Sequence, residues 1–66
     1  MRIFVNGEPR EVVEALTVDG LLRELQLFGR RIAVERNGEI VPRSRHPDLA
    51  LADGDRLEIV VAVGGG

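Results

Sequence analysis

The sequence predicts an α+β fold in which one helix packs across a mixed sheet of four to five strands. Two Asn-Gly dipeptides, at positions 6–7 and 37–38, lie between short strand-like segments, and this dipeptide strongly favours two-residue hairpin turns. One segment with helical spacing separates the two hairpins, and a markedly apolar segment at 56–62 follows them. Because a helix with one apolar face is readily buried on a sheet, the pattern indicates a two-layer domain.

The first hairpin is predicted from the alternation of side chains near the start of the chain. In an extended segment over residues 2–5, Ile3 and Val5 share one face, while Arg2 and Phe4 share the other, as expected for a half-buried strand. The turn at Asn6-Gly7 follows, and we place the second strand at about residues 10–13.

The helix is predicted over residues 18–28. Thr17 is a good N-cap and Gly29 is a good helix terminator, because these residue types satisfy or end the backbone at helix termini. Gly20 lies inside the helix at a cost of about 1 kcal/mol relative to Ala, which close packing against the sheet would explain. The predicted apolar face has i, i+3, i+4 and i+7 spacing and consists of Val18, Leu21, Leu22 and Leu25.

The second hairpin is predicted at residues 32–35 and 39–41, with Pro42 closing its second strand, since proline is rare inside sheets. Residues 43–48 are expected to form a loop. Two leucines, Leu49 and Leu51, then return the chain to the core.

The last strand, residues 56–62, is expected at the centre of the sheet, parallel to the first strand. It is the most apolar strand in the chain, and central strands are the most buried. This arrangement is a β-grasp, or ubiquitin-like, fold. We therefore expect a β-grasp domain over residues 1–63 and a flexible glycine tail at 64–66.

Composition excludes several classes of protein. The chain has no cysteine, which excludes disulfides, thiolate metal sites and a cysteine persulfide on this chain. The longest apolar run, 59–63, is five residues, whereas a membrane-spanning helix needs about 20. A net charge of −2 gives no basic footprint for nucleic acid. We expect no signal peptide, a cytoplasmic location, and neither membrane nor nucleic-acid partners.

No catalytic or metal-binding constellation is found within the domain. His46 would need an orienting partner and a pocket to act as a general base, and is expected to be a solvated loop residue. Asp53 and Asp55 flank a glycine and are expected to form a turn, because Ca²⁺ requires 6–8 oxygen ligands. Thr17 is better explained as a cap, and Ser44 has no motif around it. The arginine pairs at 30–31 and 43–45 are expected to be solvated, or alternatively to steer an acidic partner.

The chain ends in three glycines, which directly follow a strand. Glycine loses the most conformational freedom on ordering, and it forms the thinnest possible chain. A narrow active site could therefore admit this tail and reach the carboxylate of Gly66, with Gly64 and Gly65 as the tether. The alternative is a frayed end without a function.

An apolar docking patch is predicted beside this tail. If the charged members of the first and last strands mark the outside of the sheet, then Phe4, Val60 and Ala62 share its solvent face. An exposed apolar patch next to a mobile tail is typical of a docking surface. The alternative is that single exposed apolar residues are normal on protein surfaces.

Several motifs, taken in order, resemble the ThiS family of sulfur carriers. They are Thr17-Val18 with Leu21-Leu22, Ala33-Val34, the hairpin from Asn37 to Arg43, the turn at 52–55, and the terminal Gly65-Gly66. The resemblance covers nearly the whole chain at matching length. This chain departs from the family pattern at Glu35-Arg36 and in its additional glycine, Gly64; neither departure affects the terminal residue.

The resemblance implies a carrier and not an enzyme. A ThiF-type partner would use Mg·ATP to adenylate Gly66, a persulfide donor protein would supply sulfur, and the resulting thiocarboxylate would pass to the thiazole synthase ThiG of thiamine biosynthesis. The chain itself would bind no cofactor or metal. The alternatives are a β-grasp carrier for molybdopterin or tRNA thiolation, and a non-reacting β-grasp interaction module.

Overall fold

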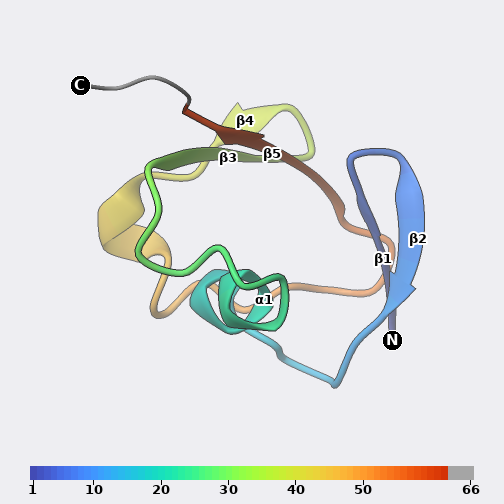
Figure 1. Cartoon of the computed structure of the whole chain (residues 1–66). Coiled ribbons are helices and arrows are strands. Elements are labelled where there is room, and N and C mark those ends of the chain that lie inside the picture. Colours follow the sequence, from blue (N-terminus) through green and yellow to red (C-terminus); the bar gives the residue numbers. More distant parts are fainter. Residues whose placement is uncertain (63–66) are drawn as a thin grey trace.

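A computed structural model, which describes residues 1–62, shows a five-stranded mixed sheet curved around one helix (Figure 1). The strand order is β2-β1-β5-β3-β4. The element bounds are β1 Arg2–Val5, β2 Glu8–Glu11, α1 Val18–Glu24, β3 Ile32–Arg36, β4 Glu39–Ile40, a 3₁₀ turn η1 Arg43–Arg45, and β5 Arg56–Val61.

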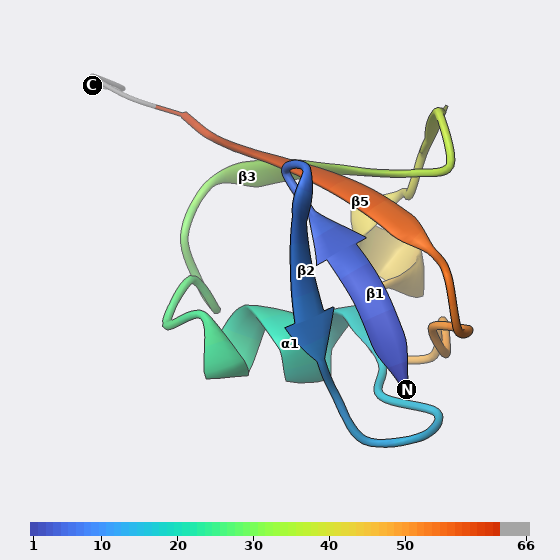
Figure 2. The same ribbon diagram turned by 90° about the vertical axis from the view of Figure 1, so that its right-hand side faces the viewer.

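β5 occupies the centre of the sheet, as predicted. It runs parallel to β1 and antiparallel to β3, and thereby joins the two hairpins into one sheet. Figure 2 shows β1 and β5 side by side, with α1 crossing beneath the sheet. This topology confirms the β-grasp fold.

Both hairpins turn at their Asn-Gly dipeptides with positive φ at each position. The values are 51° and 84° at Asn6 and Gly7, and 51° and 87° at Asn37 and Gly38, which is the type I′ turn that matches strand twist. Because this turn uses only two residues, β2 begins at Glu8. The prediction of a second strand at 10–13 was therefore about two residues late.

The N-terminus of the helix is confirmed and its predicted C-terminus is wrong. The hydroxyl of Thr17 accepts a hydrogen bond from the N–H of Gly20 at 3.0 Å, so Thr17 is the N-cap. The helix ends at Glu24 because Gln26 adopts φ 61°. The N–H of Leu27 then donates to the carbonyl of Leu22 at 2.8 Å, which is the bond of a Schellman motif.

Two glycines predicted to shape the helix have other roles. Gly29, with φ 83°, lies in the turn after the helix, where the N–H of Arg30 donates to the carbonyl of Leu27 at 3.0 Å. A Cβ on Gly20 would lie 2.6 Å from Cδ1 of Leu16. The close neighbours of Gly20 are therefore Leu16 and Thr17, just before the helix, and not the sheet.

The hydrophobic core lies between α1 and the concave face of the sheet. Leu51 is 4% exposed and Leu49 packs against the core, which confirms the predicted return of this connector. The fully buried side chains are Ile3, Val18, Leu21, Val34 and Leu57.

Candidate functional site

The predicted reactive tail, Gly64-Gly65-Gly66, lies outside the described residues, and the structure describes the point where the chain leaves the sheet. β5 ends at Val61, and the N–H of Ala62 donates to the carbonyl of Arg31 at 2.8 Å. Ala62 is thus still held against the segment that leads into β3. The last described residue is therefore still hydrogen-bonded to the segment beside the sheet.

The side chain of Asn6 holds β5 where β1 ends. Its Oδ1 accepts from the N–H of Ile59 at 2.8 Å, and its Nδ2 donates to the carbonyl of Ile59 at 3.2 Å. These two bonds replace the strand pairing that β1 no longer provides beyond Val5. Sequence reasoning identified Asn6 only as a turn residue, although an asparagine has the donor and acceptor needed for this role.

Asn37 holds the other end of β5 in a similar way. Its Oδ1 accepts from the N–H of Arg56 at 2.9 Å, and its Nδ2 donates to Oδ1 of Asp55 at 3.1 Å. The two hairpin turns therefore both fix the strand that leads into the tail.

The carboxylate of Asp55 holds together the turn that precedes β5. Its Oδ2 accepts from the N–H of Ala52 and from Nε of Arg36, each at 2.8 Å. Burial raises the pKa of Asp55, but the hydrogen bonds from Ala52, Asn37 and Arg36, together with the charge of Arg36, outweigh burial and lower the pKa below 3.8. Within residues 1–62, no group of three or more His, Cys, Asp or Glu residues could hold a metal ion.

The three residues of the predicted docking patch lie on one face of the sheet, which we call the outer face because it points away from α1. Val60 is 64% exposed, Ala62 is exposed and Phe4 is half-buried. They do not form one cluster. Phe4 is paired with Arg56, four residues before Val60, which corresponds to roughly 13 Å along a strand.

Other apolar residues continue the outer face around Val60. Ala33 of β3 is directly opposite Val60 in the ladder, and Ile40 of β4, opposite Glu35, is 65% exposed. Sequence reasoning missed both residues because it did not assign the register of β3 with β4 and β5, from which their common face follows.

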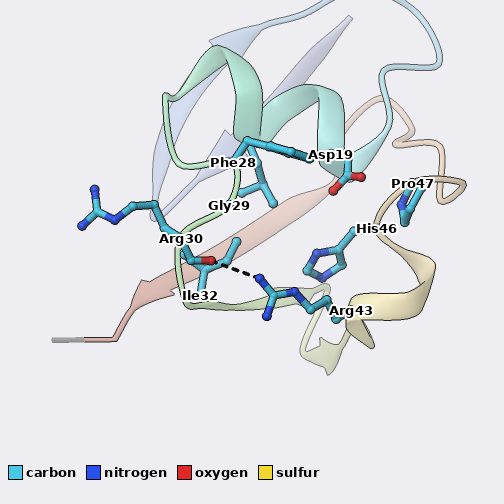
Figure 3. Close-up of a pocket in the computed structure, with 9 residues that line it drawn as sticks. Asp19, Phe28, Gly29, Arg30, Ile32, Arg43, His46 and Pro47 are labelled. Atoms are coloured by element: carbon cyan, nitrogen blue, oxygen red, sulfur yellow. Dashed lines mark hydrogen bonds between the residues drawn. The ribbon is translucent and has the colours of Figure 1, made fainter. Parts of the chain in front are cut away.

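A hollow lies between α1, the turn after it and the η1 segment (Figure 3). It has a volume of about 220 Å³ and is lined by Asp19, Leu22, Phe28, Gly29, Arg30, Ile32, Arg43, His46 and Pro47. Arg43 reaches across it, and its Nη2 donates to the carbonyl of Arg30 at 3.4 Å (Figure 3).

The prediction that His46 is a solvated loop residue was wrong. Its side chain points inward beside Arg43 (Figure 3) and the residue is only 5% exposed. Nε2 lies 3.2 Å from the carbonyl of Val41, so this nitrogen carries the hydrogen and donates it. His46 therefore anchors the segment after β4, and no acid of the described chain is hydrogen-bonded to it as a catalytic orienter would be.

None of the helices in the region from residue 1 to residue 62 is both long enough and apolar enough to cross a membrane.

Comparison with known proteins identifies the family. Residues 3–66 match the model of the ThiS family. The chain is 44% identical over 50 residues to the sulfur carrier protein ThiS of Bacillus subtilis, covering 76% of each protein. It superposes on the crystal structure of the thiamine biosynthesis protein (ThiS) from Geobacter metallireducens with a TM-score of 0.84, at 36% identity and with 100% of both chains covered.

Some relatives are much longer than this chain. It is 50% identical over 66 residues to a thiazole synthase of Paramagnetospirillum magneticum, of which it covers only 20%. A thiazole synthase of Magnetococcus marinus matches at 38% identity, again over 20% of its length. The chain thus spans about a fifth of these two proteins. The family match, the close relatives and the shared fold agree: the chain belongs to the ThiS family, whose curated members include sulfur carrier proteins.

Proposed function

We propose that this chain is the sulfur carrier of thiamine biosynthesis and that the carboxylate of Gly66 is its reacting group. The observation that carries the proposal is that the family match extends through residue 66 and so includes the terminal glycines. The described part of the chain supports a carrier role, because Asn6 and Asn37 hold β5 through hydrogen bonds and Ala62, which follows β5, is exposed.

The chemistry begins with activation of the carboxylate. An oxygen of Gly66 attacks the α-phosphorus of Mg·ATP on a ThiF-type partner, and pyrophosphate leaves. The terminal sulfur of a persulfide on a donor protein then attacks the acyl carbon and AMP leaves. Reductive cleavage of the resulting S–S bond by a thiol leaves a thiocarboxylate on Gly66. Glycine suits these steps because it has no side chain to crowd the acyl carbon.

We propose that the thiazole synthase is the sulfur acceptor. The support is that this chain matches a fifth of the length of two proteins named thiazole synthase. In these relatives, a segment similar to this chain forms part of the thiazole synthase polypeptide. Where the two are separate proteins, we expect the carrier to dock on the synthase.

Intact mass spectrometry tests the proposal directly. The full chain is incubated with ATP, Mg²⁺, the ThiF-type enzyme and a persulfide donor. We expect the mass to rise by the difference between a sulfur and an oxygen atom, with the change located on Gly66 by fragmentation. The matched control is a chain lacking Gly65 and Gly66, which should fold and remain unmodified. An unchanged mass of the full chain with an active partner would refute the carrier function.

A further inference from the structure

Two glutamates lie directly opposite each other on the outer face of the sheet. Glu35 of β3 lies directly opposite Glu58 of β5 in the antiparallel ladder, and residues in this position have Cβ atoms about 4.5–5.5 Å apart. We call these two residues the acid pair. Like charges directly opposite each other destabilise a sheet, so the pair is unfavourable in the isolated protein.

The described chain supplies no partner for the acid pair. The ion pairs within residues 1–62 join Arg2 to Glu11, Arg10 to Glu24, Arg36 to Asp55, and Arg45 to Asp48. The nearest basic residue along β5, Arg56, instead lies over the ring of Phe4, at 5.8 Å from its centroid. The charges of the acid pair are therefore left for solvent or for a partner to neutralise.

Exposed apolar side chains surround the acid pair. Ile40 is opposite Glu35, and Val60 follows Glu58 on the same face of β5; these side chains are 65% and 64% exposed. On the other side of Glu58, a hollow of about 310 Å³ is lined by Phe4, Gly7, Arg56, Leu57 and Glu58. The outer face thus combines an unpaired negative centre with apolar surroundings and space for a side chain.

We propose that the acid pair receives a basic side chain, best fitted by arginine, from the thiazole synthase that takes sulfur from this carrier. A guanidinium can donate to two carboxylates at once, and its aliphatic stem can pack on apolar neighbours such as Ile40 and Val60. This inference rests on the proposed function, because it names how the acceptor recognises the carrier.

Charge complementarity decides between the possible occupants of this face. A second copy of the chain docked through the same face would bring two acid pairs together, and like charges in contact disfavour a complex. A basic residue surrounded by apolar side chains satisfies both properties of the face. The acid pair then contributes to partner choice at the expense of stability in the free protein.

The test measures binding of the full-length chain to the thiazole synthase without ATP, so that no sulfur chemistry takes place. We expect Glu35→Gln and Glu58→Gln each to raise the Kd at least about fivefold at low ionic strength, and the effect to shrink as salt screens the charges. The matched control is Glu39→Gln on β4, which removes the same charge from the opposite face of the sheet and should leave the Kd unchanged.

Thermal unfolding supplies a second measurement. Because the two glutamates repel each other, each Glu→Gln variant should unfold at the same temperature or at one higher by about 1–5 °C. A residue with only a structural role would weaken binding by destabilising the fold. Weaker binding by a variant that is equally or more stable therefore indicates a role in docking.

The outcomes separate this inference from the proposed function. Unchanged Kd values in both Glu→Gln variants, or no binding by the wild-type chain, overturn the acid-pair inference. If the wild-type chain is nevertheless converted to a thiocarboxylate, the carrier function stands even though the acid-pair inference fails. Conversely, weaker binding by both variants supports the acid pair even if the mass of the wild-type chain never changes.

Discussion

Asp55 shows how a single side chain can connect distant parts of a small domain. It accepts hydrogen bonds from Ala52 in its own turn, from Arg36 at the end of β3, and from Asn37 in the second hairpin. The residue is 5% exposed, so a lost bond would leave a buried polar group unsatisfied. The turn before β5 is thereby joined to the hairpin beside it.

The lowered pKa of Asp55 predicts an acid-dependent loss of stability. A carboxyl whose pKa is lower in the folded state than in the unfolded state stabilises the fold above the unfolded value, about 3.9, and this contribution disappears as the pH falls through the folded pKa. We expect Asp55→Asn to lower the free energy of unfolding at pH 7 by about 1–3 kcal/mol, with a smaller difference below about pH 4.

Denaturant unfolding of both proteins between neutral and acidic pH checks this prediction. Asp53→Asn is the control, since Asp53 is an exposed residue that accepts one hydrogen bond, from the N–H of Arg2 at 2.8 Å. A stability difference for Asp55→Asn that is the same at every pH would contradict the assignment of the effect to the charged carboxylate.

Asn6 combines a turn conformation with two side-chain hydrogen bonds, and Asn6→Gly separates the two roles. Glycine adopts the positive φ of the turn readily but cannot make the bonds to Ile59. We expect a loss of about 1–2 kcal/mol in the free energy of unfolding, since each hydrogen bond contributes about 1 kcal/mol. Unchanged stability in chemical denaturation would show that these bonds do not stabilise β5.

At the scale of the elements, the C-terminus of α1 is strained. Gln26 adopts φ 61°, a left-handed conformation that costs a residue with a side chain about 1–2 kcal/mol. Gln26→Gly should therefore raise the free energy of unfolding by about 1 kcal/mol, or the melting temperature by about 4–8 °C. Gln26→Ala keeps the strain and should not stabilise the protein. Equal melting temperatures for the two variants would refute this explanation.

The elements that were predicted correctly have strong local signals. Both Asn-Gly turns and the Thr17 cap depend on residues within a few positions of each other. The helix end was misplaced because the residue in the left-handed conformation is Gln26, whereas Gly29, three positions later, is the more usual terminator. Local sequence could not distinguish these two endings.

The features that were missed depend on tertiary packing. His46 is buried where its ring contacts the carbonyl of Val41. This contact exists only once β4 has joined the sheet. Likewise, Ala33 and Ile40 join the outer face through the alignment of β3 with its two neighbours. Alternation identified the faces of β1 and β5 correctly, but the neighbours across the sheet require the register.

At the scale of the whole molecule, the outer face should be separable from the fold. Val60 is 64% exposed, so Val60→Asp is expected to leave the melting temperature within a few degrees of the wild-type value. A charge placed at an apolar contact should weaken binding to the thiazole synthase at least about tenfold. Val13→Asp is the control, because Val13 is 66% exposed and lies outside the sheet. Equal weakening by both variants would argue against this face.

The central position of β5 also determines when the fold can be completed during synthesis of the chain. The bonds between Asn6 and Ile59 join residues 53 positions apart, whereas each Asn-Gly hairpin can form from neighbouring residues alone. A ribosome that synthesises this chain must therefore release β5 before the two hairpins can join into one sheet. Closing so long a loop is slow compared with forming a hairpin, so we expect the docking of β5 to limit the folding rate. The strand that precedes the C-terminal glycines is then fixed only when the whole domain has folded.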